Sequence, residues 1–417
     1  MSCQCGEFRK TLHYVSPGHG GWGVIRIAAL IPESYQLFVS PFACGRHGAL
    51  GGAVNGIKDR ISYVYIDESD IVSGNYENLI PDAVDELLEF LDHRPKVLLI
   101  FVSCLDDLLG TDHVDLNRRL SMNHPDIQFR SCHMNPISMD TKFPPGVTLQ
   151  NNIYSLLRPG LKKAGAINLI GNHSPVGREC ELFEMMKNRG YEVNHITDYE
   201  TFEDFQTMAS SCLNLVLSPV AGYACREMEK SLGIPFLDSY VTYELSEIKE
   251  FYRQLGERLQ VDMDTSLYEA RAEKAIRRAR ETIGDHPVSL DFQAVKKPFT
   301  LAKALLEYGF RVELVMADEV KVFEKASYRF IVDNHPEVEI VNALHHDMAK
   351  SVWKGRESLC IGFVSGYATG SGRVVNLMDD EYMFGFYGIT KLMGMMEKAY
   401  LEASNLQVMI EEAGLVI

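Results

Sequence analysis

Short runs of valine, isoleucine and leucine alternate along this chain with longer stretches in which apolar residues recur at helical spacing. Such runs are typical of strands buried on both faces of a sheet, and the stretches between them are typical of helices that cover the sheet. The alternation occurs in three segments. We therefore predict an α/β fold of three Rossmann-like domains, each with a parallel sheet, around a central cleft. The boundaries fall near residues 163 and 285, which gives domains 1–163, 164–285 and 286–417.

The individual elements follow from the same pattern and from the helix stop signal Gly233-Ile234-Pro235. The strands that we predict are Gln36–Ser40, Ser62–Ile66, Val97–Ser103, Ala166–Ile170, Tyr191–His195, Leu213–Ser218, Val288–Phe292, Arg311–Val315, Glu339–Val341 and Leu359–Phe363. The helices that we predict are one that follows Pro81 and carries Val84, Leu87, Leu88 and Leu91, and then Arg178–Arg189, Glu203–Ala209, Cys225–Leu232, Tyr268–Thr282, Phe299–Tyr308 and Ile389–Ala403.

Charge and hydropathy narrow the classes of partner. The 57 acidic residues outnumber the 41 lysines and arginines, so the net charge is −16, which argues against a surface for nucleic acid or anionic membranes. The strongest apolar run, Val97–Val102, is far shorter than the roughly 20 residues of a membrane helix. The first residues, Met-Ser-Cys-Gln-Cys-Gly-Glu, do not form a secretory signal. We expect a cytoplasmic protein that binds no nucleic acid and no membrane.

Nine cysteines, an odd number, are not expected to form a disulfide framework in a cytoplasmic protein. Cys180, Cys212 and Cys360 lie within helix or strand patterns and are interpreted as core residues, and Cys225 as a packed thiol.

The glycine-rich segment Gly366–Gly372 follows a strand, but it matches neither a dinucleotide-binding loop nor a P-loop. We interpret this segment as a strand-to-helix turn.

Two other cysteines follow predicted strands of the first domain. Cys44 lies in Ser40-Pro-Phe-Ala-Cys-Gly-Arg-His47, and Cys104 lies in Phe101-Val-Ser-Cys-Leu-Asp-Asp-Leu-Leu-Gly-Thr-Asp112. Loops at the carboxyl ends of parallel strands converge where α/β proteins bind ligands, and thiolates are the ligands that iron–sulfur clusters require. Upstream, Ser16-Pro-Gly-His-Gly-Gly-Trp-Gly23 surrounds His19 with glycines, which allow the backbone to approach a bulky group closely.

These segments resemble the component 1 (molybdenum–iron protein-like) family of nitrogenases, which includes the dark-operative protochlorophyllide and chlorophyllide reductases and the coenzyme F430 reductive cyclase. The segment around Cys44 is similar to the family's H-G-P-x-G-C loop, and that around Cys104 to its S-T-C-P-x-x-x-I-G-D-D motif. The resemblance continues through Leu213–Ser218, Met228–Pro235 and Phe384–Gly388. It covers nearly the whole chain, and the Cys104 motif is its most specific part.

The resemblance implies an iron–sulfur cluster, either 4Fe–4S or a larger P-cluster-like group, held at an interface with a second, similar subunit. Cys44 and Cys104 match two of the three cluster-binding cysteines of the family. The first family cysteine falls on or next to His19 here, which is a departure. The third ligand is therefore open between His19, Cys5, Cys3 and an oxygen ligand from the partner subunit. We favour a cysteine of the N-terminal segment, Cys5 slightly over Cys3.

The sequence departs from the family a second time where nitrogenases bind their molybdenum–iron cofactor through a cysteine and a histidine. The same offsets give Leu217/Ser218 and Val375/Asn376 in this chain, and neither pair is a good iron or molybdenum ligand. We therefore expect no cofactor bound in that way. The cavity is expected to admit an organic substrate directly, as in the tetrapyrrole reductases.

The resemblance further implies an oxygen-sensitive oxidoreductase subunit that receives electrons from a separate, homodimeric, ATP-dependent iron–sulfur reductase. Two alternatives stay open: a scaffold on which a metal cluster is assembled, and a cluster-free α/β ligand-binding protein. The sequence does not determine the substrate, or whether the partner subunit is a second copy or a similar chain. His345-His346-Asp347 is interpreted as a surface group that opens a helix. His133, close to Cys132 and the loop Pro136–Pro145, is interpreted as a structural residue, with a position lining the cavity as the alternative.

Overall fold

The computed structural model describes residue 14 and residues 23–134, 143–160, 165–350 and 353–412. The candidate ligands Cys3, Cys5 and His19 lie outside the described residues. Contacts within the chain divide it into two compact units. One unit comprises residues 22–173 and 190–240, and the other comprises residues 1–21, 174–189 and 241–417.

Three parallel sheets form the framework, and all their strand pairs run in the same direction. The sheet of β1–β4 has the order β2-β1-β3-β4, that of β5–β8 has the order β6-β5-β7-β8, and that of β9–β13 has the order β11-β10-β9-β12-β13. The strands are β1 Ser34–Ser40, β2 Ile61–Tyr65, β3 Val97–Ser103, β4 Gln128–Met134, β5 Ala166–Ile170, β6 Glu192–His195, β7 Leu213–Val216, β8 Phe236–Asp238, β9 Val288–Asp291, β10 Val312–Ala317, β11 Glu339–Asn342, β12 Leu359–Ile361 and β13 Val374–Val375. The predicted α/β class with three parallel sheets is confirmed, and the domain boundaries stay a prediction.

Helices fill the connections between the strands, as parallel pairing requires. They are α1 Gly23–Ala28, α2 Phe42–Val54, α3 Glu68–Val72, α4 Tyr76–Phe90, α5 Cys104–Leu109, α6 His113–Asn123, α7 Pro145–Tyr154, α8 Glu181–Lys187, α9 Phe202–Gln206, α10 Gly222–Leu232, α11 Leu245–Leu259, α12 Ser266–Ile283, α13 Pro298–Glu307, α14 Lys325–Asn334, α15 Phe363–Thr369, α16 Gly385–Leu401 and α17 Leu406–Glu412. Among the described residues, no helix is both long and apolar enough to cross a membrane.

Two sequence-based expectations were wrong in detail. The helix expected to follow Pro81 is α4, which begins at Tyr76 and contains the proline. Gly366–Gly372 is not a strand-to-helix turn, because its first residues belong to helix α15 and the segment leads into strand β13. Gly370 adopts a φ of 72° at the end of α15, a backbone conformation that glycine adopts without steric cost and that commonly ends a helix.

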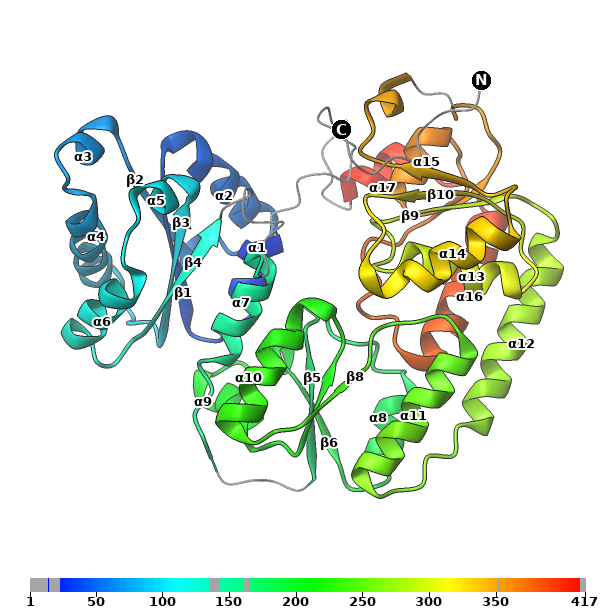
Figure 1. The fold of residues 1–417 in the computed structure, drawn as a ribbon, viewed down its shortest axis with the longest axis horizontal. Coiled ribbons are helices and arrows are strands. Elements are labelled where there is room, and N and C mark those ends of the chain that lie inside the picture. The colour runs from blue at the N-terminus through cyan, green and yellow to red at the C-terminus, as the bar shows by residue number, and fades with distance from the viewer. Residues whose placement is uncertain (1–13, 15–22, 135–142, 161–164, 351–352, 413–417) are drawn as a thin grey trace. The chain divides into compact units, whose positions relative to one another are not determined.

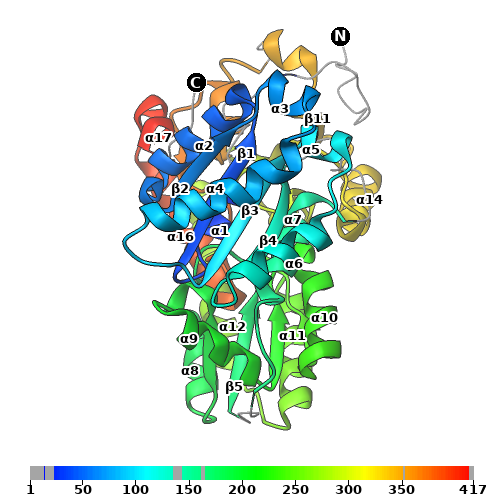
Figure 2. The ribbon, with the colours of Figure 1, turned by 90° about the vertical axis from the view of Figure 1, so that its left-hand side faces the viewer.

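The sheet of β1–β4 is buried on both faces, because every residue of β1 and β3 is buried. Alternate residues of these strands point to opposite faces. One face, with Val39 and Ile100, packs on apolar residues of α4 and α6. The other, with Phe38 and Phe101, packs on α1 and α7. Figure 1 shows the two groups of helices on either side of the strands, and Figure 2 looks onto the face covered by α4 and α6.

A buried carboxylate caps helix α13 in the unit that contains β9–β13. Oε1 of Glu324 accepts hydrogen bonds from the backbone N–H groups of Phe299 and Thr300, at 2.9 and 3.2 Å. Oε2 is buried and has no hydrogen-bond partner among the described residues. Burial raises the pKa of Glu324 to about 7 from its ordinary value of 4.5, although the two N–H groups and Lys321 oppose this shift.

The raised pKa makes the stability of the protein depend on pH. Keeping Glu324 protonated stabilises the folded state fully below pH 4.5, and this contribution is lost as the pH rises through 7. We expect Glu324→Gln to match the wild type near pH 4.5 and to be more stable at pH 8, by up to about 3 kcal/mol. Urea unfolding at both pH values measures this difference. The exposed Glu319→Gln is the control for losing one charge, and an equal gain from Glu324→Gln at both pH values would contradict the assignment.

Candidate functional site

The carboxyl ends of β1 and β3 form the point at which the first sheet reverses its winding direction. The chain passes from β1 outward to β2, and then returns to β3 on the other side of β1. Open α/β sheets bind their ligands in the crevice that such a reversal creates. Val39 pairs with Val102 in this register, so the residues that follow the two strands emerge at the same edge of the sheet.

Cys44 and Cys104 both emerge at this edge. Cys44 lies in the first turn of α2, which follows β1, and Cys104 is the first residue of α5, which follows β3 directly. Both thiols are partly exposed and form no disulfide. The prediction placed them on loops, whereas the structure places them at the beginnings of helices on neighbouring strands.

Glycines hold α2 close to the sheet and thereby fix the position of Cys44. A Cβ atom on Gly45 would lie 3.0 Å from Cε1 of Tyr65, and one on Gly48 would lie 3.2 Å from Cε1 of Tyr63. Both distances are shorter than ordinary van der Waals contact, so larger side chains would push α2 away from β2. The small residues around Cys44 therefore serve close helix–strand packing.

Two buried hydroxyl groups lie at the ends of the strands that precede the thiols. Ser40 ends β1 and Ser103 ends β3, and both side chains are buried. Neither Oγ atom has a hydrogen-bond partner among the described residues. Buried polar groups are normally paired, so the edge carries unused hydrogen-bonding capacity beside the two cysteines.

Other cysteines in the described part of the chain are poor ligand candidates. Burial raises the pKa of Cys132, Cys225 and Cys360 to about 12, and it raises the pKa of Cys180 well above its ordinary value with help from the charge of Glu181. Thiolate formation is therefore disfavoured at these four positions. Cys212 is partly exposed and donates a hydrogen bond to the carbonyl oxygen of Ala166 at 3.1 Å.

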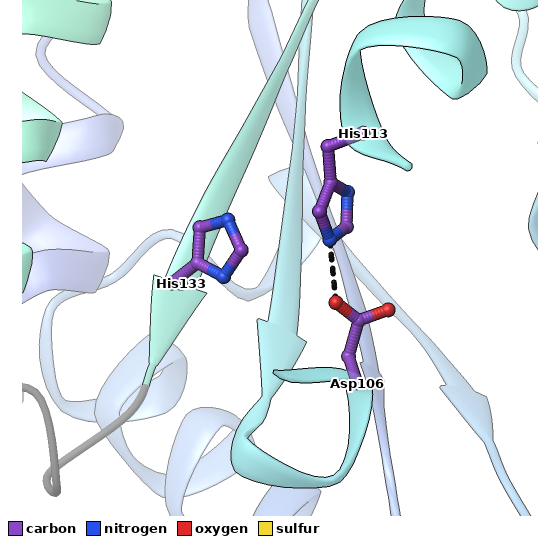
Figure 3. Close-up of side chains that lie close together, drawn as sticks. All are labelled: Asp106, His113 and His133. Atoms are coloured by element: carbon purple, nitrogen blue, oxygen red, sulfur yellow. Dashed lines mark hydrogen bonds and ion pairs between the residues drawn. The ribbon is translucent and has the colours of Figure 1, made fainter. Parts of the chain in front are cut away.

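A polar cluster that the sequence analysis missed occupies the same edge. It consists of Asp106 on α5, His113 on α6 and His133 on β4, and their ligand atoms all lie within 4.8 Å of one another. Figure 3 shows the three side chains converging from these three elements. His133 pairs with Val102 of β3 in the sheet register, so the missed strand β4 brings it to the site.

The second histidine group was interpreted incorrectly in part. His345 is 3% exposed, so it is not a surface residue, whereas His346 is exposed. The cause is local, since Nδ1 of His345 accepts a hydrogen bond from the backbone N–H of Asp347 at 3.1 Å and the ring turns inward. A short 3₁₀ helix, His346–Lys350, follows.

The positions aligned with the nitrogenase cofactor ligands lie at the ends of strands in the other two sheets. Leu217 and Ser218 follow β7, and both are buried. Val375 ends β13, and the next residue, Asn376, is exposed. Neither pair contains a thiol or an imidazole group.

Three doubly wound parallel sheets, with two thiols at the switch point of the first, define an α/β framework with a candidate ligand site. A family model described as nitrogenase component 1 type oxidoreductase matches residues 21–396. The chain therefore belongs to this family, as its motifs predicted, and the coarse prediction of a nitrogenase-type oxidoreductase is confirmed.

Solved structures show the same fold. One, described as nitrogenase Cp1 at pH 6.5, has a TM-score of 0.72 and 17% sequence identity, and the match covers 94% of each chain. Another, described as nitrogenase Cp1 at pH 5, has a TM-score of 0.61 and 16% identity over 92% of this chain and 88% of the other. At these identities the likeness is one of fold. No curated protein matches the sequence.

Proposed function

We propose that this chain is the electron-accepting, catalytic-type subunit of a nitrogenase-like oxidoreductase, in which Cys44 and Cys104 bind an iron–sulfur cluster. The observation that carries the proposal is the position of these two thiols. They follow neighbouring strands at the switch point of a sheet, in a chain that belongs to the nitrogenase component 1 family.

The residues at this edge fit an iron–sulfur group in their donor chemistry. Thiolates are the usual ligands of such clusters, and both cysteines are partly exposed rather than sealed in the core. Two thiols are too few for a four-iron cluster, so Cys5, Cys3 or His19, or a residue of a partner subunit, would complete the ligand set. When bound, the group would accept and release single electrons at low potential.

Apolar side chains around the thiols support the presence of a partner subunit. Phe42 on α2, Leu108 on α5 and Val72 on α3 are exposed by 67%, 80% and 79%, and all follow carboxyl ends of β1, β2 or β3. Exposed apolar groups that gather at one edge are typical of protein interaction sites. The proposed occupant is a second component 1-type subunit, either another copy of this chain or a similar one.

The proposed electron donor is a homodimeric, ATP-dependent iron–sulfur reductase that acts in the cytoplasm with this subunit. The substrate is proposed to be an organic molecule that binds directly. The side chains at Leu217, Ser218, Val375 and Asn376 support this view, because they replace the cysteine and histidine that bind the molybdenum–iron cofactor in nitrogenases.

Iron analysis of cysteine variants tests the proposed ligands. We expect anaerobically purified wild-type protein to be brown. Cys44→Ala and Cys104→Ala are each expected to be colourless and to bind at least about tenfold less iron, because each removes a thiolate that the cluster needs. The measurements are iron and acid-labile sulfide per chain, with the visible spectrum.

The matched control is Cys212→Ala, which removes another partly exposed thiol and is expected to keep the iron. Circular dichroism checks that all variants are folded. Full iron content in both single variants at Cys44 and Cys104 would overturn the assignment.

A further inference from the structure

The cluster of Asp106, His113 and His133 has the composition of a metal site and contains no cysteine. Nε2 of His113 lies 2.5 Å from Oδ2 of Asp106. The two imidazole rings meet edge to face, with their centroids 4.8 Å apart. Figure 3 shows one ring nitrogen of His113 pointing at the Asp106 carboxylate, with the ring of His133 beside them.

Two further groups hold these side chains in place. Tyr76 donates a hydrogen bond to Oδ1 of Asp106 at 2.6 Å, which leaves Oδ2 facing the histidines. Nδ1 of His133 is hydrogen-bonded to Oδ1 of Asp107 at 2.8 Å, which fixes the orientation of that ring. A carboxylate behind a histidine and a hydroxyl behind a carboxylate are the second layer of contacts that orients ligands in metal sites.

The cluster is largely removed from water. Asp106 is fully buried, and the side chain of His113 is only 15% exposed. Nδ1 of His113 is buried and has no hydrogen-bond partner among the described residues. A buried carboxylate beside two imidazoles is a setting in which a bound cation is stabilising.

We propose that Asp106, His113 and His133 bind a divalent transition-metal ion of the class of Zn²⁺ or Fe²⁺, at a site distinct from the thiols of Cys44 and Cys104. Two imidazoles and one carboxylate are the ligand set that such ions prefer. Around zinc, ligand atoms lie about 3.3 Å apart, so Asp106 and His113 would separate slightly and His133 would move closer. Three protein ligands leave one or more coordination positions for water or substrate.

Cobalt(II) binding tests the site in the full-length protein, because its visible d–d absorption reports the ligands directly. The background is the double variant Cys44→Ala/Cys104→Ala, so that these two thiols contribute neither colour nor ligands. We expect one equivalent of Co²⁺, displaced by one equivalent of Zn²⁺, without the near-ultraviolet charge-transfer band of a cobalt–thiolate bond.

Variants in the same background assign the ligands. His133→Ala and His113→Ala are expected to weaken Co²⁺ binding by at least 100-fold, and Asp107→Asn by roughly 10-fold to 100-fold, as for other groups that orient a ligand. The matched control is His124→Ala. His124 is also paired with an aspartate, Asp85, at 2.8 Å, and this variant is expected to bind normally.

The variants must be folded for the binding results to be compared. The side chain of His133 is 32% exposed, so His133→Ala is expected to fold, and thermal unfolding checks this. Unchanged affinity in both His113→Ala and His133→Ala, a thiolate band, or no stoichiometric binding in the double variant would overturn the site. Metal analysis of the protein as purified then separates zinc from iron. Because Cys44 and Cys104 are absent from this background, loss of the proposed iron–sulfur cluster and loss of this site give separate results.

Discussion

Substrate reduction by this protein is expected to stop when ATP is replaced by a non-hydrolysable analogue. The chain has no P-loop and no nicotinamide or flavin fingerprint, so the proposed cluster needs an external electron donor. In the proposed arrangement the donor is an iron–sulfur ATPase that docks over the edge carrying Cys44 and Cys104. ATP hydrolysis would gate electron transfer by shifting the populations of docked and undocked states.

Product formation is measured with the purified reductase, a chemical reductant and either ATP or the analogue. We expect the rate with the analogue, or without the reductase, to fall to the background level. Cys104→Ala is expected to give the same background rate with ATP present. Equal turnover with NADPH or ferredoxin alone would rule out this electron path. Release of a metal cluster in a single stoichiometric event, without repeated turnover, would favour the scaffold alternative.

Replacing Glu181 is expected to cause the largest loss of stability of any substitution considered for this chain. Its carboxylate is buried at the beginning of α8 and accepts three hydrogen bonds from O–H and N–H groups, besides a longer one from the thiol of Cys180 at 3.8 Å. The three donors are the hydroxyl of Tyr252 at 2.8 Å and the backbone N–H groups of Phe386 and Tyr387 at 2.7 and 3.0 Å. Gly385 leaves the necessary space, since a Cβ atom there would lie 2.0 Å from Oε1 of Glu181.

Glu181→Ala removes the acceptor and leaves these donors unpaired, two of them on fully buried residues. Each unpaired buried group costs about 1–3 kcal/mol, so we expect a loss of about 3–5 kcal/mol in the free energy of unfolding. Urea or thermal unfolding measures it. The control is Glu184→Ala, an exposed residue of the same helix that accepts one hydrogen bond from Tyr268, with an expected loss below about 1 kcal/mol. Equal effects of the two substitutions would contradict this role.

The sequence predicts strands well where burial on both faces produces an uninterrupted apolar run. Val97–Ser103 and Ala166–Ile170 have the predicted bounds for this reason. Strand β4, Gln128–Met134, was missed because polar and apolar residues are mixed along it and it is only partly buried. Its side chains follow neither a continuous apolar run nor a clear alternation, so no periodic signal marks it.

The candidate site was accessible to prediction only in part, for the same reason. Cys44 and Cys104 belong to local motifs, so the sequence points to them directly. The cluster of Asp106, His113 and His133 depends on two features without a local signal. One is the path of the chain after the turn at Gly110, with a φ of 71°, which returns His113 of α6 to Asp106 of α5. The other is the pairing of β4 with β3, which no neighbouring residue encodes.

The assignment of α8 to a different unit from its flanking strands has a consequence for synthesis of the protein. Residues 174–189 belong to the unit that contains α16, whereas β5 and β6 on either side belong to the other unit. The buried side chains of α8, among them Leu182 and Met186, pack against elements that include α16. A ribosome completes α8 some 200 residues before α16, so the part of α8 that packs on α16 stays uncovered during nearly half of translation. Newly made chains are therefore exposed to aggregation at this helix until the C-terminal region emerges.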